Sequence, residues 1–228
     1  MHSKVFAAFG SVAMFAGLPL MAADNDAPSR LKAAATAFSE VMGTPDKSIP
    51  QDLLNKAQCV VIVPGLKKGA FIVGAKYGRG FVSCRSKSGV GWAAPGSVRV
   101  EGGSFGFQIG GSETDVIMLI MNERGMRRLL TSKFTLGADA TVAAGPVGRN
   151  TQAETDALMT AEILTWSRAR GLFAGVALTG ATLREDADWN NELYGRSITN
   201  REVLTSTIAL PASAQPLLDE LNRYSSRK

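Results

Sequence analysis

The chain has 228 residues, a formal net charge of +5 and 45% hydrophobic residues. Its only histidine is His2, near the N-terminus, which excludes a Ser-His-Asp or Cys-His nucleophile system and a histidine-based metal site. The mild basic excess favours anionic partners such as phospholipid head groups. No basic groove laced with aromatic residues is present in the sequence, so we expect no nucleic-acid partner, and we expect no cofactor.

The N-terminus has the layout of a secretory signal peptide. A lysine precedes an apolar run over residues 5–21, and Ala22 and Ala23 then lead into an acidic segment. This run is short for a membrane-spanning helix. We therefore expect residues 1–23 to be a signal peptide, cleaved after Ala22 or Ala23. The remaining residues, 24–228, suit a single domain in the periplasm or outside the cell.

Two helices are predicted ahead of the first strand. Residues 29–42 are rich in alanine, and Leu31 and Phe38 share one face of the helix that this segment would form. Residues 51–57 form a second, shorter helix, with Pro50 suited to its start. The apolar face of the first helix could lie in a membrane interface, but its few cations favour packing on the domain.

Strands separated by glycine-rich turns are predicted next. They cover residues 59–63, 70–77, 80–84, 90–93, 98–101, 104–109 and 115–121. In the sixth of these segments Phe105, Phe107 and Ile109 alternate with small or polar residues, which is typical of a half-buried strand. Residues 116–121 are apolar without a break, as in a strand that is covered on both faces.

The second half of the chain continues with short elements. Asn122 can cap a short helix, whose basic residues lie away from its apolar face. These basic residues are Arg124, Arg127 and Arg128. Later strands are predicted over residues 134–136, 140–144, 162–168 and 172–178. A helix over 187–193, a short element over 201–205 and a helix over 216–224 complete the chain.

The glycine distribution indicates the fold class. Of the 24 glycines, 20 fall between Gly65 and Gly180, where they bound or interrupt the predicted strands. Strands broken so often by glycine predict a strongly curved, mostly antiparallel sheet, either barrel-like or sandwich-like. Helices occupy both ends of the chain, so the class is α+β.

Several long segments closely resemble the SYLF-domain family of lipid-binding proteins. They are CVVIVPGLKKGAFIVGAKYGRGFVSCR at 59–85, GGSFGFQIGG at 102–111, MNERG at 121–125, SKFTLGADATVAAGPVGR at 132–149 and SRARGLFAGVALTGA at 167–181. The resemblance covers roughly residues 30–195. It implies binding of acidic phospholipids, and some eukaryotic members also bind actin. With the signal peptide, it implies an exported, bacterial member of the family.

The two cysteines lie in strand-like segments 25 residues apart. In an oxidising compartment Cys59 and Cys84 can form a disulfide, which would stabilise the fold by about 3 kcal/mol. The alternative is a pair of buried free thiols on adjacent strands. A redox-active pair is not indicated, because the spacing is unlike C-x-x-C.

Six cations fall in or beside the predicted turns of the first strands. Alternate turns of a meander lie at opposite ends of the sheet, so four of these cations would form one rim and two would lie at the other end. The first set is Lys67, Lys68, Arg85 and Lys87, and the second is Lys76 and Arg79. Such a rim would attract an anionic bilayer by about 1 kcal/mol per charge. The alternative is a set of solvated turn residues.

The sequence thus predicts a non-enzymatic protein of the bacterial cell envelope that binds phospholipid, with phosphatidylglycerol or cardiolipin as the expected anionic lipids. One alternative is a structural or protein-interaction module with an envelope protein partner and no lipid ligand. A weaker alternative is a hydrolase that uses carboxylates such as Asp115, Asp139 and Glu162, which would need two acidic groups of different pKa in one cleft. A further acidic cluster suits a helix start better than a calcium site. It consists of Glu185, Asp186 and Asp188.

Overall fold

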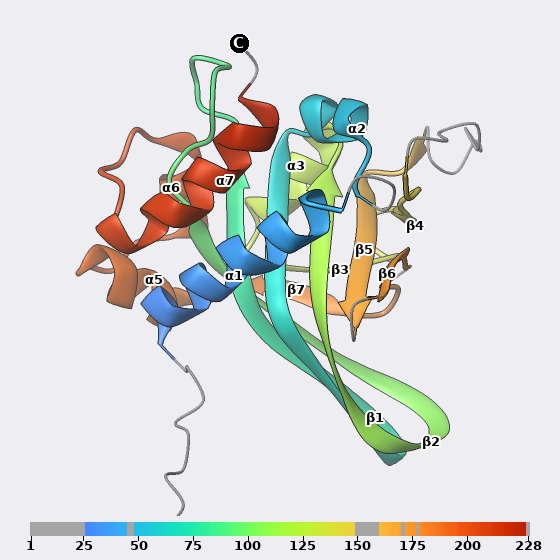
Figure 1. Ribbon diagram of the computed structural model, residues 1–228. Helices are drawn as coiled ribbons and strands as arrows, with labels where there is room; N and C mark the ends of the chain where they lie inside the picture. Colours follow the sequence, from blue (N-terminus) through green and yellow to red (C-terminus); the bar gives the residue numbers. More distant parts are fainter. Residues whose placement is uncertain (1–25, 45–47, 149–159, 170–171, 177, 227–228) are drawn as a thin grey trace, which may run out of the picture.

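The computed structural model describes residues 26–44, 48–148, 160–169, 172–176 and 178–226 (Figure 1). The predicted signal peptide over residues 1–23 lies outside this description. The helices are α1 (Ala27–Met42), α2 (Gln51–Lys56), α3 (Glu123–Leu129), α5 (Ala187–Tyr194), α6 (Asn200–Thr205) and α7 (Gln215–Ser225), with the short 3-10 turn η1 (Ala212–Ala214) before α7. The strands are β1 (Cys59–Cys84), β2 (Gly96–Ile120), β3 (Lys133–Thr135), β4 (Val142–Ala144), β5 (Ile163–Ala169), β6 (Leu172–Gly175) and β7 (Thr182–Glu185).

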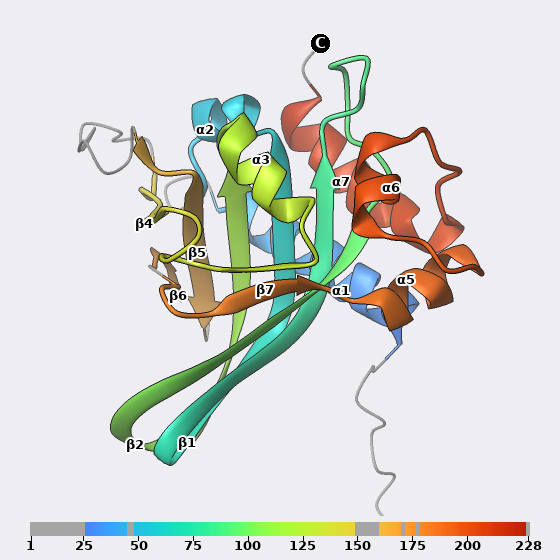
Figure 2. The ribbon, with the colours of Figure 1, turned by 180° about the vertical axis from the view of Figure 1, so that it is seen from behind.

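The largest feature is a two-stranded antiparallel ribbon made of β1 and β2. Its pairing extends from Cys59 opposite Ile120 to Val82 opposite Gly96, with irregularities between Val63 and Leu66 and between Ala70 and Ile72. The ribbon is bent back on itself near the middle of both strands, and the bend projects away from the helices (Figures 1 and 2). Bulges increase local twist and bend a strand, which explains how one ribbon turns so sharply.

A disulfide joins the two ends of β1. Twenty-five residues of extended strand would span about 80 Å, yet the Cα atoms of Cys59 and Cys84 lie 3.9 Å apart. The bend therefore brings the first and second halves of β1 into contact. Of the two states that the sequence left open, the structure has the disulfide, and both cysteine side chains are buried.

Glycine allows the two halves of β1 to cross closely. A Cβ atom on Gly80 would lie 2.1 Å from the backbone oxygen of Ile62 and 2.7 Å from the Cα atom of Val63. A Cβ atom on Gly78 would lie 2.8 Å from the Leu66 side chain. Residues with side chains would push the two halves apart, so these glycines permit the crossing and are not turn residues.

The remaining strands extend the ribbon into a half-barrel. One half of the ribbon contains the start of β1 and the end of β2, and here β2 pairs with β5. The other half contains the end of β1 and the start of β2, and here β2 pairs with β7. Strand β3 pairs with β7, β6 pairs with β5, and β4 runs parallel to β5. The prediction of an α+β fold with a strongly curved, mostly antiparallel sheet and helices at both chain ends is confirmed.

Several strand predictions were wrong in their boundaries. The segments 59–63, 70–77 and 80–84 form the single strand β1, and 98–101, 104–109 and 115–121 form most of β2. The predicted strand at 90–93 lies in the connection between β1 and β2, where only Trp92 makes an isolated bridge, to Arg85. Strand β7 was not predicted.

Helices α1 and α7 cover one face of the ribbon, whereas α3 lies on the opposite face (Figure 2). Helix α1 buries Leu31, Ala34 and Phe38 against α7 and the ribbon, which confirms that its apolar face packs on the domain. The opposite face of the ribbon forms a second core with β3, β7 and the segment around Leu178. Among the described helices, none has the length and apolar character needed to cross a bilayer.

Candidate functional site

The six predicted cations form three separate groups in the structure. The expected turns at Lys67–Lys68 and at Lys76–Arg79 do not exist, because both pairs lie within the continuous strand β1. The expected rim of four cations is therefore wrong. The bend in β1 instead brings Lys67 close to Arg79 on the helix-facing side and Lys68 close to Lys76 between the two halves of the strand. Arg85 and Lys87 lie at the far end of the ribbon, beside α7.

Lys67 and Arg79 line a cavity of about 280 Å³ on the helix-facing side. Arg30 from α1 supplies a third cation, and the remaining lining residues are Gly65, Tyr77, Gly78 and Trp189. Sequence reasoning did not place Arg30, Tyr77 or Trp189 in a binding site. No local pattern could do so, because the cavity is formed by α1, α5 and both halves of β1.

Arg79 is held firmly within this cavity. Its Nε atom lies 2.9 Å from the Tyr77 hydroxyl, to which it donates a hydrogen bond. The same nitrogen lies 3.0 Å from a carboxylate oxygen of Asp186, which is buried. The guanidinium carbon lies 4.7 Å from the centre of the Trp189 ring, a cation-π contact. These contacts fix the guanidinium in place and leave its two Nη nitrogens without a partner among the described residues.

Lys68 and Lys76 lie between the two halves of β1. Side chains two residues apart share one face of a strand, so Lys68 faces the same way as the buried Leu66 and Lys76 the same way as Gly78. Burial lowers the pKa of Lys68 below its usual value, and the nearby charge of Lys76 lowers this pKa further.

Arg85 has a structural role at the end of β1. Its Nη2 donates to the backbone oxygen of Leu54 over 2.9 Å and to the Ser225 hydroxyl over 2.6 Å. Its Nη1 donates to the backbone oxygen of Ser225, and its guanidinium carbon lies 3.8 Å from the centre of the Trp92 ring. The guanidinium thus joins α2 and α7 to the ribbon. Lys87, two residues further on, is exposed.

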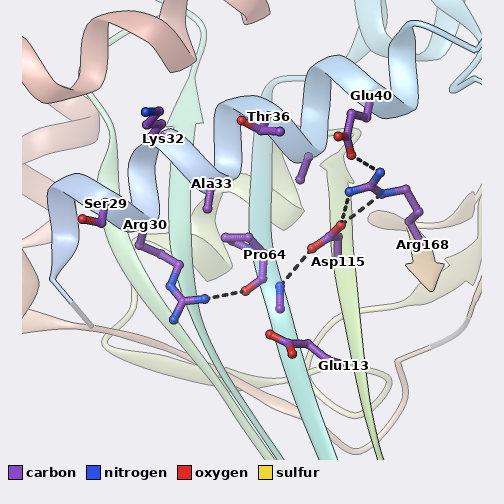
Figure 3. Close-up of a pocket in the computed structure, with 12 residues that line it drawn as sticks. Ser29, Arg30, Lys32, Ala33, Thr36, Glu40, Pro64, Glu113, Asp115 and Arg168 are labelled. Atoms are coloured by element: carbon purple, nitrogen blue, oxygen red, sulfur yellow. Dashed lines mark hydrogen bonds and ion pairs between the residues drawn. The ribbon is translucent and has the colours of Figure 1, made fainter. Parts of the chain in front are cut away.

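A second, wider groove of about 710 Å³ lies beside the cationic cavity, between α1 and the sheet (Figure 3). At one end of it, Arg168 on β5 contacts Glu40 of α1 and Asp115 of β2, with its Nη2 2.6 Å from an Asp115 oxygen. The other Asp115 oxygen accepts a hydrogen bond from the backbone of Gly65 over 3.0 Å. These two carboxylates raise the pKa of Arg168 despite its partial burial. The groove carries charges of both signs.

The bend of the ribbon has a composition unlike the rest of the chain. Residues 69–75 (GAFIVGA) and 102–112 (GGSFGFQIGGS) contain no acidic or basic residue. Three lysines flank these segments on β1, namely Lys67, Lys68 and Lys76, and two acidic residues flank them on β2, namely Glu101 and Glu113. Glu101 is already paired with Arg99 and Arg184. The projecting end of the molecule is therefore uncharged, with more basic than acidic residues beside it.

The carboxylates considered for catalysis lie in three different settings. Asp115 is paired with Arg168, whereas Asp139 accepts a hydrogen bond from the backbone of Thr135 over 2.7 Å at the end of β3. Glu162 is buried and accepts a hydrogen bond from the backbone of Thr141. Each of these three carboxylates is therefore held by a different partner.

The acidic cluster at the start of α5 is divided by its contacts. Asp186 pairs with Arg79, Glu185 accepts from the backbone of Asn200, and Asp188 lies in the first turn of α5. Within the described part of the chain, no group of three potential ligands is arranged to hold a metal ion.

The second basic cluster lies on α3. The Asn122 side chain accepts from the backbone of Gly125 and caps this helix, as predicted. Arg127 lies 3.6 Å from Glu123, and Arg124 lies 3.5 Å from Glu162. Arg128 is exposed.

The structure thus combines a half-barrel flanked by helices, a cationic cavity and an uncharged projecting bend. The sequence profile of the Ysc84 family, described as "Las17-binding protein actin regulator", matches residues 101–224, more than half of the chain. The chain therefore belongs to the Ysc84 family, whose domain is also called SYLF, and the resemblance seen in the sequence is confirmed.

Similar proteins occur in animals and yeast. The SH3 domain-containing YSC84-like protein 1 of Homo sapiens is 31% identical over 214 residues, which cover 90% of this chain and 62% of that protein. Its namesake in Xenopus laevis is 32% identical over 215 residues, or 90% of this chain and 64% of that protein. Protein YSC84 of Saccharomyces cerevisiae is 30% identical over 212 residues, or 87% and 44%. The chain spans less than two thirds of the length of these relatives.

Proposed function

We propose that this chain binds membrane surfaces containing anionic phospholipid, without catalysing a reaction, through the bent end of the β1–β2 ribbon. The observation that carries the proposal is the position of two uncharged segments, which include three phenylalanines, at a projecting bend with three lysines beside it. The family description, "Las17-binding protein actin regulator", agrees with a binding role.

The apolar part of the bend supplies one contribution to binding. Segments 69–75 and 102–112 include Phe71, Phe105 and Phe107. Apolar area moved from water into the acyl boundary of a bilayer gains about 25 cal/mol per Å². A projecting ribbon can reach this boundary without moving the half-barrel itself, because the bend extends beyond the other elements (Figure 2).

The lysines supply the second contribution. A cation near an anionic membrane surface gains about 1 kcal/mol, and this gain falls with salt. Lys67, Lys68 and Lys76 lie on β1 next to the uncharged segments, so they would reach the head groups when the bend enters the interface. An anionic head group between Lys68 and Lys76 would also relieve their mutual repulsion.

The proposal includes export to the cell envelope, on the signal-peptide layout of residues 1–23. Phosphatidylglycerol and cardiolipin are the anionic lipids expected there. The test is co-sedimentation of the mature chain with vesicles of phosphatidylcholine alone or with increasing phosphatidylglycerol, at low and high salt. We expect binding to rise with phosphatidylglycerol and to fall with salt.

Two variants separate the two contributions. Lys67→Glu/Lys68→Glu should weaken binding at low salt, whereas Phe71→Ser/Phe105→Ser should weaken it at high salt as well. Arg127→Glu/Arg128→Glu on α3 is the matched control, because it changes the net charge by the same amount away from the bend. Equal losses in both charge variants would show that only net charge matters and would refute the proposed site.

A second candidate function is binding of a protein partner without lipid. The family description names a protein, Las17, that family members bind, and the groove beside α1 carries charges of both signs. Failure of the mature chain to sediment with any vesicle would favour this candidate.

A further inference from the structure

The cavity lined by Arg30, Lys67 and Arg79 is a site of its own, distinct from the apolar bend. We propose that this cavity binds a terminal phosphate, that is, a phosphate monoester group. The phosphate could come from a lipid head group or from a soluble phosphate ester. Only the first of these sources rests on the proposed function. The ligand chemistry is the same in both cases.

Three cations converge on this cavity from three parts of the chain. Arg30 comes from α1, Lys67 from the first half of β1 and Arg79 from the second half. The lining residues include no carboxylate. Asp186 pairs with Arg79 from behind, and Glu113 reaches the edge of the cavity beside Gly65 and Arg30. Two acidic groups thus partly balance three basic ones and leave the cavity positive.

The hydrogen-bond donors in the cavity suit an anion with several oxygens. The Lys67 ammonium has no hydrogen bond or ion pair with any residue in the described part of the chain. The Tyr77 hydroxyl accepts from Arg79 Nε, so its own O–H remains to donate. With the Arg79 Nη nitrogens, this gives donors from three side chains, and a phosphate oxygen accepts strongly from charged donors.

The geometry favours a terminal phosphate over a bridging one. A monoester presents three free oxygens and carries a charge of about −1.5 to −2 near neutral pH, whereas a diester presents two oxygens and one charge. A diester would also need room for two chains to leave a cavity of about 280 Å³. Trp189 closes one side as a fixed wall, because its ring stacks on Phe81 at 5.7 Å between centroids.

Calorimetric titration of the mature chain with glycerol 3-phosphate and with inorganic phosphate tests the site without a membrane. We expect both probes to bind, and Lys67→Met to weaken glycerol 3-phosphate binding by about tenfold or more. Tyr77→Phe should weaken it by a smaller factor. Lys87→Met is the matched control, because Lys87 carries the same charge, is exposed at the far end of the ribbon and does not line the cavity. We expect this control to change affinity less than about twofold.

Vesicles then identify the source of the phosphate. Vesicles with phosphatidic acid present a monoester, and vesicles with phosphatidylglycerol, adjusted to equal surface potential, present a diester. A preference for phosphatidic acid that is lost in Lys67→Met and kept in Lys87→Met would assign the site to a lipid head group. Binding of glycerol 3-phosphate with no vesicle binding would keep the phosphate site and overturn the membrane function.

Two results would overturn the phosphate site. One is the absence of glycerol 3-phosphate binding together with equal binding to both vesicle types, which would leave the membrane function standing. The other is an equal loss of affinity in Lys67→Met and Lys87→Met, which would show that general charge attraction, not the cavity, holds the anion. The thermal unfolding of each variant, compared with the parent chain, checks that the fold is intact.

Discussion

Cys59 and Cys84 are the first and last residues of one strand, and they are bonded to each other. The bond joins the two ends of the bent strand β1 and so closes this strand into a loop. A disulfide stabilises a fold mainly by restricting the unfolded chain, and a loop of this length corresponds to about 3 kcal/mol. We expect Cys59→Ala/Cys84→Ala to lower the free energy of unfolding in urea by about this amount.

The parent chain with a thiol reductant provides the control for the disulfide. Both cysteines are buried in the folded state, so the reductant should act only once the chain unfolds. The reduced parent chain should then unfold at the urea concentration at which the variant unfolds. A loss of less than about 1 kcal/mol in the variant would mean that the ribbon keeps its bend without the bond.

Arg85 and Lys87 test the distinction between structural and surface cations. Arg85 donates hydrogen bonds to backbone oxygens of α2 and α7, so Arg85→Gln should lower the free energy of unfolding by about 2–3 kcal/mol. Lys87→Gln removes the same charge from an exposed position and should change it by less than about 0.5 kcal/mol. Both free energies are measured by urea unfolding, and equal effects would contradict the assigned role of Arg85.

The Lys68–Lys76 pair predicts a measurable change in titration. Lys76→Met should move the pKa of Lys68 upward, because a nearby positive charge is removed. This pKa should still stay below its usual value, because burial is the larger cause of the shift. Lysine side-chain resonances followed by NMR against pH give the pKa directly. Lys67→Met, on the other face of the strand, is the control and should leave it unchanged.

The lowered pKa of Lys68 also determines the direction in which stability changes with pH. The folded chain holds the Lys68 proton less tightly than the unfolded chain does, since its pKa is lowered on folding. Between the lowered pKa and the usual value near 10.5, the contribution of Lys68 to stability therefore rises with pH. In Lys76→Met this rise should be smaller.

Arg168 couples α1 to the sheet. It contacts Glu40 on α1 and Asp115 on β2, and Asp115 in turn accepts from the backbone of Gly65 at the irregularity in β1. Arg168→Met should lower the free energy of unfolding by about 1–2 kcal/mol and speed amide exchange in the C-terminal half of α1. Glu40→Gln removes the more exposed partner and should cost less than about 0.5 kcal/mol. Unchanged exchange in α1 would show that its apolar face alone holds it.

The sequence patterns predicted the ends of the chain better than its middle. The helices that became α1, α2, α3, α5 and α7 are near their predicted positions, because apolar periodicity and caps such as Asn122 are local signals. The fold class followed from the glycine content. The pairing of Cys59 with Cys84 was one of two states that the sequence allowed.

The middle of the chain was misjudged because one signal has two meanings. Pro64–Gly65 and Gly78 were interpreted as parts of turns, and the structure uses them for an irregularity and a close crossing within one strand. A glycine at a turn and a glycine at a backbone crossing cannot be distinguished without knowing the partner strand. Strand β7 was overlooked because its four residues, TLRE, lack a clear alternation.

A prediction of the cationic cavity would have needed the same knowledge of long-range contacts. Lys67 and Arg79 were assigned to opposite ends of a meander, whereas the bend brings them into one cavity. Both residues come from β1, and the cavity also needs Arg30 from α1 and Trp189 from α5. Only tertiary contacts bring these residues together, so no spacing in the sequence could predict the cavity.

The bent ribbon also has two separate parts, the projecting bend and the part that belongs to the half-barrel. The crossing at Gly78 and Gly80, the disulfide and the pairings with β5 and β7 all lie on the body side of the bend, so they set the half-barrel independently of how far the ribbon extends. Inserting two residues into β1 and two opposite them in β2 would keep the alternation of faces. The projection would lengthen by about 3 Å in total, because the added length divides between the outgoing and returning halves of the ribbon. The length of the bend, and with it the depth to which it enters a partner surface, can thus change while the half-barrel stays the same.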